Sequence, residues 1–466
     1  MDTCSALDDP LLLPGGRGDE EAAGAGGAGG GDAFLVIDLE GRAKSSTADS
    51  VWNLCNVILG AGLYALPRVF AALGLLGGAA AVGAVAWLTY ARVDLMLRAS
   101  EALHAPTYAR TLRALWGRRA AVAVHLAMVL GCAGFVALYI IIAADVLVGN
   151  ERFTGIIADL FPALPDPLPW YGRRAAVVSW ITLAAVPLLG ATSMHGMAAT
   201  SAVSVVASVA SVAGMLALWG AAAWQGELAP ARWLPDPALF GGPPALAAAR
   251  LLSTLPTVMT AFVCHMSIHP LLQDLRGYTP RRMRAVVARS LGACGAVYAA
   301  MGAAGVSVFG SGVAGNVLYN VQPEALAPLL GGSAAAGLAA STAVKGAVGV
   351  AMLSSVSIIL WSIRSEVLEL LHEALGRPPS AAAFGAVTYA SLAFIYALCL
   401  AVEDAYAMVG LVGATCGIAM AFLFPGLIAL RPVAGAPPRR ALGWTLLGLG
   451  ALLMAAGLAA ALQGAG

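Results

Sequence analysis

The residues best suited to chemistry lie inside long apolar stretches. Gly60 and Gly62 stand in the middle of the first stretch, and Asn56 precedes Gly60 by about one helical turn. Glycine opens a helix at low steric cost and exposes its backbone N–H and C=O groups. In lipid, exposed backbone groups are tolerated only where water, an ion or a ligand occupies them. The pattern therefore fits either a binding site in an unwound helix or close helix packing around the two glycines.

A second stretch with unusual residues runs from 255 to 270 and contains Pro256, Pro270, His265 and His269. Ionisable side chains at such positions are hypotheses for function by default. His265 lies deeper than His269, and it fits a proton acceptor or a contact to a bound molecule as well as an ordinary core histidine. The two histidines are one turn apart, but no third ligand is evident, so we do not expect a metal between them.

Clustered hydroxyl groups mark a third stretch, with serine at positions 354, 355 and 357. Hydroxyl oxygens near the membrane midplane can bind a small hard cation. They can equally donate to the carbonyl one turn earlier in their own helix. Three hydroxyls within four positions, together with a glycine-broken helix elsewhere in the chain, leave these two interpretations equally balanced.

The composition excludes whole classes of protein. Of the 466 residues, 60% are hydrophobic and 11% are charged, and the mean hydropathy is +0.83, whereas soluble domains carry about 25% charged residues. A cytosolic enzyme could not cover its surface with so few charges. A net charge of +1 provides no basic field, so no nucleic-acid partner is expected. Membrane lipid is the expected surrounding, and no cofactor is expected, since the seven cysteines lack metal or redox spacing.

Eleven apolar stretches are long enough to cross a bilayer as helices, which takes about 20 residues each. We therefore predict an all-α integral membrane protein with eleven transmembrane helices. The transmembrane domain would comprise residues 49–463, after a tail of residues 1–48. The approximate spans are 50–70, 74–98, 120–148, 174–192, 198–224, 250–271, 286–309, 337–363, 381–402, 405–430 and 441–463.

The basic residues predict an orientation, because lysine and arginine concentrate in cytoplasmic loops. With the N-terminus in the cytoplasm, 17 of the 26 basic residues fall in inside segments and five in outside segments. We expect a cytoplasmic N-terminus and, with eleven helices, a C-terminus on the opposite side. An even number of helices would break the alternation in the second half of the chain.

The first 48 residues differ from the rest, because they are acidic and contain a glycine-rich run from Gly24 to Gly31. We expect a disordered cytoplasmic tail. Within it, Asp8 precedes Leu12 and Leu13 at the spacing of an acidic dileucine sorting pattern. Such patterns also arise by chance in acidic tails, so the plasma membrane and a vacuolar or endolysosomal membrane both stay open.

Four motifs occur in the order and spacing of a known family. The run Ser50 to Gly62, S-V-W-N-L-C-N-V-I-L-G-A-G, is similar to an opening S-V-F-N-L-S-N-x-x-x-G-x-G. Over residues 45–430 the chain resembles the amino acid/auxin permease family, and within it the sodium-coupled neutral amino acid transporter (SNAT) branch. The other matching motifs are Leu255 to His265 with its proline and F-x-C-H, Ile363-Arg364-Ser365, and Val409 to Ala414 with Phe424-Pro425-Gly426.

The resemblance implies a LeuT-like fold of the APC superfamily, a five-plus-five inverted repeat with an eleventh helix. Repeat one would cover about 50–224, repeat two about 250–430, and the extra helix about 441–463. The implied function is secondary active transport of amino acids by alternating access, as a symporting solute carrier and not an enzyme. Neutral substrates are expected, because no unpaired deep acid or base awaits a charged side chain.

The resemblance also implies the site residues. The backbone from Val57 to Gly62 would hold the amino acid's carboxylate and ammonium groups. The ion site would fall at Asn56 with the hydroxyls of Ser354 and Ser355. The whole predicted substrate site consists of Asn56, Val57, Ile58, Leu59, Gly60, Ala61, Gly62, Phe262, Cys264 and His265.

Departures from the branch leave the coupling ion open between sodium and a proton. The outer loops lack cysteine, the chain has no N-x-S/T sequon, and Leu353 or Ser355 stands where the branch commonly has threonine. Related branches use protons. The same fold also serves an alternative function, an amino acid-sensing receptor without substantial transport, which substrate flux would discriminate. The sequence does not determine the oligomeric state, and a monomer is compatible with it.

Overall fold

The computed structural model describes residues 45–164, 169–185, 194–235, 254–376, 380–402, 405–433 and 436–464. Residues 1–44 of the predicted tail, with the sorting pattern at Asp8, lie outside these described residues. The end of that tail belongs to the helical domain, because Ser45 pairs through backbone hydrogen bonds with the chain around Leu275. Helix α1 (Thr47–Ile58) begins two residues later.

The regular secondary structure of the described residues is helical apart from one short hairpin, β1 (Gly149–Asn150) and β2 (Phe153–Thr154). Nine helices in the described ranges are long and apolar enough to cross a membrane, and Arg174–Ala184 is a shorter apolar helix. A helix satisfies its backbone hydrogen bonds internally, which is what a lipid solvent requires. The all-α prediction is therefore confirmed for the described residues.

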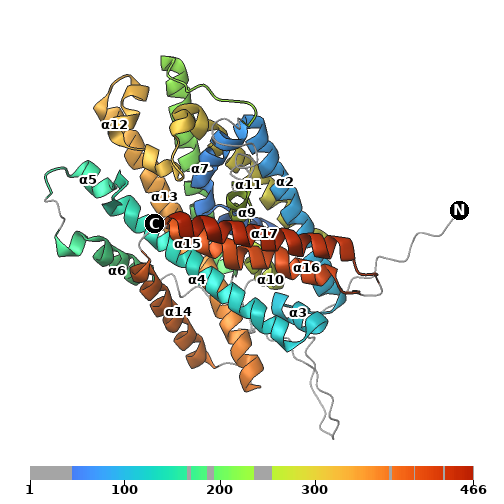
Figure 1. Cartoon of the computed structure of the whole chain (residues 1–466). Coiled ribbons are helices and arrows are strands. Elements are labelled where there is room, and N and C mark those ends of the chain that lie inside the picture. Colours follow the sequence, from blue (N-terminus) through green and yellow to red (C-terminus); the bar gives the residue numbers. More distant parts are fainter. Residues whose placement is uncertain are drawn as a thin grey trace, which may run out of the picture. The chain divides into compact units, whose positions relative to one another are not determined.

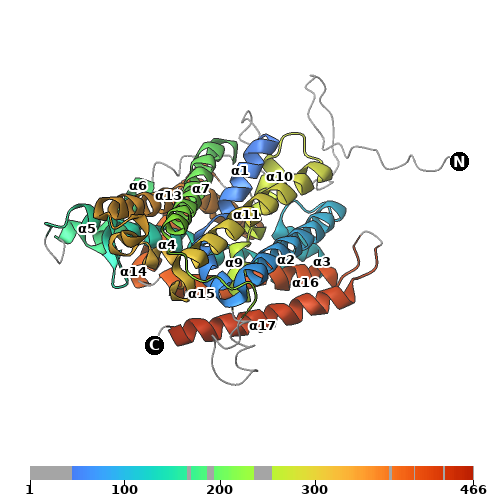
Figure 2. The same cartoon turned by 90° about the horizontal axis from the view of Figure 1, so that it is seen from above.

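Helices α4 (Arg118–Val148) and α13 (Ala334–Leu375) pack along one another. α4 is buried on every side from residue 131 to residue 146, as expected of a helix that is apolar all round. Helices α6 (Arg174–Ala185) and α14 (Ala381–Ala401) pack on α4 and on each other, and they lie at the same edge of the bundle in Figures 1 and 2.

A second group of helices contains α1, α7 (Met194–Gln225) and α11 (Pro280–Phe309), which pack on one another as Figure 2 shows. α11 also packs along α2 (Leu66–Ala102). α7 packs on α13 as well, and so connects this group to the first one.

Two helices are interrupted, as predicted. α1 ends at Ile58, and the chain re-enters a helix at a 3-10 turn, Ala61–Ala65, which continues into α2. α9 (Leu255–Ala261) ends three residues before α10 (His265–Asp274) begins. α9 packs on the 3-10 turn, so the two interruptions are neighbours in space.

The boundary that the sequence predicts between the spans 50–70 and 74–98 lies at Gly74, whose backbone is not helical. The chain unwinds at Gly60, re-enters a helix at Ala61–Ala65, and bends at Gly74 into the helix that continues to Ala102. The kink is at Gly74, whose φ of 74° is available to glycine at little cost. Beyond it, the N–H groups of Leu75 and Leu76 donate to carbonyls of the segment that follows α7.

The tenth predicted span, 405–430, is not a regular α-helix. α15 (Ala405–Val412) leads into π-helical turns from Gly413 to Leu423, and α16 (Phe424–Ala429) follows. A π turn contains an extra residue and shifts carbonyls off the regular ladder. α17 (Arg440–Gly464) packs along α15 and α16 (Figure 1).

Two side chains from other helices bind carbonyls of the π-helical turns. The guanidinium of Arg92, on α2, donates to the Ala421 carbonyl at 3.0 Å and lies over the Phe422 ring. The Tyr108 hydroxyl of α3 (Tyr108–Trp116) donates to the Met420 carbonyl at 3.0 Å. The irregular backbone is therefore held by hydrogen bonds from α2 and α3.

A buried ion pair ties the hairpin to the helices. Lys345 of α13 is fully buried, and its ammonium group lies 2.6 Å from Asp159 of α5 (Ile156–Leu160) and 2.8 Å from the Thr154 carbonyl. Gln322, directly before α12 (Pro323–Leu326), accepts from the Thr154 hydroxyl at 2.7 Å. These contacts fix the loop between α4 and α6 to the start of α13.

Replacing each of two glycines of α2 with alanine should change the stability of the protein in opposite directions. At Gly74, alanine would adopt a conformation that is essentially glycine-only, and its Cβ would lie 2.7 Å from backbone atoms of Trp233 and Leu234. The strain alone costs about 1–3 kcal/mol. At Gly83 of the same helix a Cβ meets nothing within 4 Å, so alanine stabilises by about 0.5–1 kcal/mol. Melting temperatures of the purified Gly74→Ala and Gly83→Ala variants test this, and equal shifts would contradict it.

Candidate functional site

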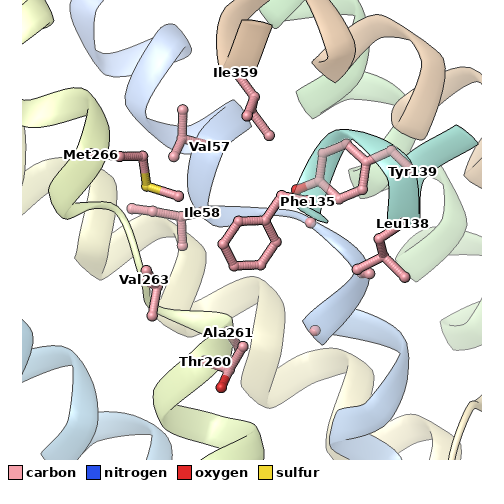
Figure 3. Close-up of a pocket in the computed structure, with 13 residues that line it drawn as sticks. Val57, Ile58, Phe135, Leu138, Tyr139, Thr260, Ala261, Val263, Met266 and Ile359 are labelled. Carbon is pink, nitrogen blue, oxygen red and sulfur yellow. The ribbon is translucent and has the colours of Figure 1, made fainter. Parts of the chain in front are cut away.

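A small cavity lies between the two interrupted helices (Figure 3). Its volume of about 20 Å³ has room for a water molecule and not for an amino acid. The walls of the cavity must therefore move apart before an amino acid can bind there. The lining residues, none of them charged, are Val57, Ile58, Gly60, Ala61, Gly62, Phe135, Leu138, Tyr139, Thr260, Ala261, Val263, Met266 and Ile359.

Tyr298 of α11 links the ends of both interrupted helices. Its hydroxyl oxygen lies 2.7 Å from the carbonyl oxygen of Ala261, at the end of α9, and also contacts the carbonyl of Ile58, at the end of α1. A hydroxyl carries one proton, so it can fully satisfy only one of these carbonyls at a time. Phe262 packs edge-on against the Tyr298 ring, with the centroids 5.0 Å apart, and helps to hold it there.

Ala61 and Gly62, on the other side of the break, also line the cavity. Ala61 and Gly62 begin the helix that continues into α2, so their N–H groups have no acceptor one turn earlier in that helix. Helix starts of this kind carry partial positive charge and bind anionic groups. The cavity is thus lined both by Ile58 and Ala261, whose carbonyls contact Tyr298, and by Ala61 and Gly62, whose N–H groups lack an acceptor within their helix.

The two glycines of the break are closely packed. A Cβ on Gly60 would lie 2.2 Å from the Tyr139 hydroxyl oxygen, and a Cβ on Gly62 would lie 2.9 Å from the Ala261 Cα. Only glycine permits these approaches without displacing a neighbour. Both glycines pack tightly and also line the cavity, so the two roles that the sequence left open occur at the same positions.

The cavity lining overlaps half of the predicted substrate site. Val57, Ile58, Gly60, Ala61 and Gly62 line it, as the break in α1 led us to expect. Leu59 is buried away from it in the core.

Phe262, Cys264 and His265 do not line the cavity; Val263 of the unwound segment and Met266 in the first turn of α10 line it instead. Phe262 instead packs on Tyr298. Both ring nitrogens of His265 are buried without a hydrogen-bond partner among the described residues.

The cavity walls that come from α4 and α13 were not predicted from the sequence. Phe135, Leu138 and Tyr139 belong to an uninterrupted apolar run, and Ile359 belongs to another. Figure 3 shows the Phe135 ring in the middle of the lining residues. No local signal separates these residues from lipid-facing ones. The phenolic hydroxyl of Tyr139 was the one polar group in its run, and it lies against the break at Gly60.

Asn56 faces away from the cavity, toward α7 and α13. Its Oδ1 accepts from the Ser355 hydroxyl at 2.6 Å, and its Nδ2 donates to the Ser201 hydroxyl at 3.0 Å. The hydroxyl oxygens of Ser204 and Ser355 lie 2.8 Å apart, and each lies within 2.9 Å of the Ala351 carbonyl. We call Asn56, Ser201, Ser204 and Ser355 the hydroxyl cluster.

The hydroxyl cluster contains part of the predicted ion site. The structure brings Asn56 and Ser355 together, whereas Ser354 is half-buried and makes no hydrogen bond with another described residue through its side chain. Ser201 and Ser204 of α7 were not predicted, because serine in an apolar helix usually bonds to its own backbone. Four oxygens lie close together here, namely Asn56 Oδ1, the two hydroxyl oxygens of Ser204 and Ser355, and the Ala351 carbonyl oxygen. Only the two hydroxyls carry a proton, so the cluster has more hydrogen-bond acceptors than donors.

The two histidines of α10 have different neighbours. His269 Nε2 lies 2.8 Å from the Ser100 hydroxyl, and the ring stacks on Tyr108 with centroids 5.8 Å apart. His265 has no such contact. His269 therefore serves to pack α10 on α2 and α3.

The fold and the site together define a class of protein. A bundle of membrane helices whose interrupted segments meet at one cavity is the arrangement of secondary transporters. The chain belongs to the family described as transmembrane amino acid transporter protein, which it matches over residues 43–463. It is therefore a multi-pass membrane protein that transports amino acids, and not an enzyme, and the resemblance to the amino acid/auxin permeases is confirmed.

Named relatives come from plants, animals and yeast. Amino acid transporter AVT6E of Arabidopsis thaliana is 26% identical over 86% of this chain and 79% of its own length. Sodium-coupled neutral amino acid transporter 7 of Bos taurus is 24% identical over 62% of this chain and 59% of its own. Vacuolar amino acid transporter 5 of Schizosaccharomyces pombe is 22% identical over 82% and 84%.

Solved transporter structures share the fold. A mutant of the Eremococcus coleocola manganese transporter superposes with a TM-score of 0.57 at 13% identity, over 88% of this chain and 85% of that one. A sodium-coupled sialic acid symporter in a substrate-bound outward-open state superposes with a TM-score of 0.53 at 13% identity, over 90% of each chain. At these identities the likeness concerns the fold alone.

Removal of the Tyr298 hydroxyl tests whether it supports both breaks. In Tyr298→Phe the carbonyls of Ile58 and Ala261 lose their shared donor, and a buried group left unpaired costs about 1–3 kcal/mol. We expect a lower melting temperature and slower amino acid uptake in proteoliposomes. Tyr389→Phe, at a position 62% exposed on α14, is the matched control. If both variants behave like the wild type, Tyr298 does not support the breaks.

Proposed function

We propose that this protein is a secondary active transporter of neutral amino acids that couples their movement to a sodium ion or a proton by alternating access. The observation that carries the proposal is the cavity between two interrupted helices, which the residues at both breaks line and which, among the described residues, no charged side chain lines. Family membership supplies the substrate class.

The architecture that we propose is the five-plus-five inverted repeat with an eleventh helix. In such folds the first helix of each repeat is discontinuous and the substrate lies between them. The break in α1 and the break between α9 and α10 occupy those positions. The nine long helices become ten when Ala61–Ala102 is divided at Gly74, with α1 and residues 61–73 as the two halves of the first, and the shorter α6 is the eleventh.

The bound amino acid would be oriented by backbone groups. Its carboxylate would accept from the N–H groups of Ala61 and Gly62, at the positive end of a helix. Its ammonium group would donate to the carbonyl of Ile58 or Ala261, whichever Tyr298 leaves free. This arrangement recognises the part that all amino acids share.

The remaining walls would select the side chain. Phe135, Leu138, Val263, Met266 and Ile359 are apolar, and no acid or base faces the cavity from the described residues. A charged side chain would be left without a partner in a medium where that is costly. Neutral amino acids are therefore the substrates that we propose.

Alternating access would begin with separation of these walls. The cavity is too small for an amino acid, and the contact of Gly62 with Ala261 closes it between the two breaks. Both breaks lie at points where few backbone hydrogen bonds have to be exchanged during movement. A state in which α1 and α9 move apart would open the cavity to one side of the membrane.

The coupling ion would bind at the hydroxyl cluster. A cation there would replace the bond between Ser355 and Asn56, and would take oxygens from Asn56, Ser204, Ser355 and the Ala351 carbonyl. Asn56 lies in the last turn of α1, just before the chain unwinds. An ion that binds one conformation better shifts the population toward it, so its binding would order the break before the amino acid arrives.

The vacuolar membrane is the location that we propose, with a cytoplasmic N-terminus. The Schizosaccharomyces pombe relative is named as a vacuolar transporter. The tail contains the acidic dileucine spacing at Asp8, Leu12 and Leu13. The basic residues concentrate on the side where the N-terminus would lie.

An uptake screen tests the substrate class and the ion together. The purified full-length protein is placed in proteoliposomes, and the twenty amino acids are tested with sodium and pH gradients imposed separately. We expect uptake of neutral amino acids and no uptake of arginine, lysine, aspartate or glutamate, with acceleration by one of the two gradients. Saturable binding without flux would instead indicate a sensor.

Three serine and asparagine variants test the ion site. We expect Asn56→Ala and Ser355→Ala to raise the ion concentration for half-maximal uptake by about 5- to 150-fold, the usual range of coupling between two sites. Ser354→Ala is the matched control, because Ser354 is adjacent in α13 but outside the hydroxyl cluster. Uptake is compared at equal protein amounts. Unchanged ion dependence in both test variants would place the ion elsewhere.

A further inference from the structure

Helix α13 extends well beyond the thickness of a membrane. Its 42 residues span about 63 Å at 1.5 Å per residue, about twice the roughly 30 Å of a hydrocarbon core. Near its C-terminal end, Glu366, Glu369 and Glu373 are spaced by three and four positions and so share one face. That face is turned toward α3 and α4, as the contacts of these carboxylates show.

His125 of α4 lies within this group of carboxylates. Its side chain is fully buried, and its Nδ1 lies 2.8 Å from Glu366 Oε2. Its Nε2 is buried and has no hydrogen-bond partner in the described part of the chain. One ring nitrogen of His125 and one oxygen each from Glu369 and Glu373 lie within 4.8 Å of one another.

The side chains are arranged as in metal sites that contain a histidine ligand. A ligating histidine usually binds a carboxylate through its other ring nitrogen, which sets the tautomer and the ring orientation. Here Glu366 occupies Nδ1, so Nε2 is the nitrogen left for a ligand. One imidazole and two carboxylates suit a divalent transition-metal ion.

We propose that His125, Glu369 and Glu373 form a binding site for a divalent transition-metal ion such as Zn²⁺, with Glu366 as the residue that orients His125. Such an ion connects α4 to α13 at a place separate from the amino acid cavity. The proposal does not depend on which amino acid or coupling ion the protein transports.

Two arginines of α3 compete with the metal for the carboxylates. Arg110 Nε lies 2.9 Å from Glu369 Oε1, and Arg113 Nη1 lies 2.9 Å from Glu373 Oε1. Each carboxylate has a second oxygen, but the charge is already partly neutralised. The side chain of Arg113 is half exposed, so its displacement gives the ion a route from water. The arginines therefore lower the affinity without blocking the site.

Zinc titration of the purified full-length protein in detergent, after removal of metal by a chelator, tests the site. We expect calorimetry to give one Zn²⁺ per chain, and Co²⁺ to give a visible ligand-field absorption. His125→Gln should weaken binding at least 100-fold, and Glu366→Gln by 10- to 100-fold, about the usual effect of losing an orienting carboxylate. His104→Gln, at an exposed histidine, should leave binding unchanged.

A gain of affinity distinguishes the site from a folding defect. Arg113→Gln releases Glu373 from its competing partner, and we expect it to tighten Zn²⁺ binding several-fold, which a misfolded protein would not do. Absence of stoichiometric Zn²⁺ binding, equal binding by the wild type and His125→Gln, or unchanged affinity in Arg113→Gln would each overturn the proposal.

Discussion

The arrangement of the site depends on one contact, in which the Tyr298 hydroxyl is shared by the carbonyls of Ile58 and Ala261. Two helices that stop inside a membrane expose carbonyls that lipid cannot satisfy. Because Tyr298 contacts the ends of both α1 and α9, it holds the two breaks together. Its single proton cannot satisfy both carbonyls fully. The site is therefore stable while closed and still has an acceptor to offer.

The hydroxyl cluster connects this site to the rest of the bundle. Asn56 belongs to the short helix before the break, whereas its partners belong to α7 and α13. A movement of α1 must therefore change hydrogen bonds in the hydroxyl cluster. This connection is the physical link through which an ion at the cluster would influence the amino acid cavity, because a ligand acts only through its different affinity for two states.

Features of the backbone, such as helices and a helix break, could be predicted where a local sequence pattern indicates them. Helical structure follows from apolar length, and the break at Gly60 follows from glycine spacing, so both could be predicted. Phe135 and Tyr139 could not be predicted as cavity walls, because an apolar run has no marker for the side that faces a cavity. Ser201 and Ser204 were missed because their partners are distant in the chain.

The positions of the helix breaks were easier to predict than the side chains that face the cavity at those breaks. Phe262, Cys264 and His265 were predicted from the resemblance, and they do lie at the second break. The chain is unwound between Ala261 and His265, so no helical period runs through the break, and the sequence cannot say which residues around it face the cavity. The structure turns Val263 and Met266 to the cavity. The boundary between the first two predicted spans lies at Gly74, where a glycine in a non-helical conformation separates two helical segments.

The π-helical turns between Gly413 and Leu423 have a consequence for how the chain tolerates change in length. Each π turn accommodates a residue that a regular helix would not hold. Loss of that residue would let the turn close into the regular ladder while the helical turns on either side keep their orientation. The carbonyls of Met420 and Ala421, which now accept from Tyr108 and Arg92, would then accept within their own helix, and the two side chains would lose these partners. A deletion of one residue in this segment would therefore cost the contacts with α2 and α3 and leave unchanged the face that α16 presents to its neighbours.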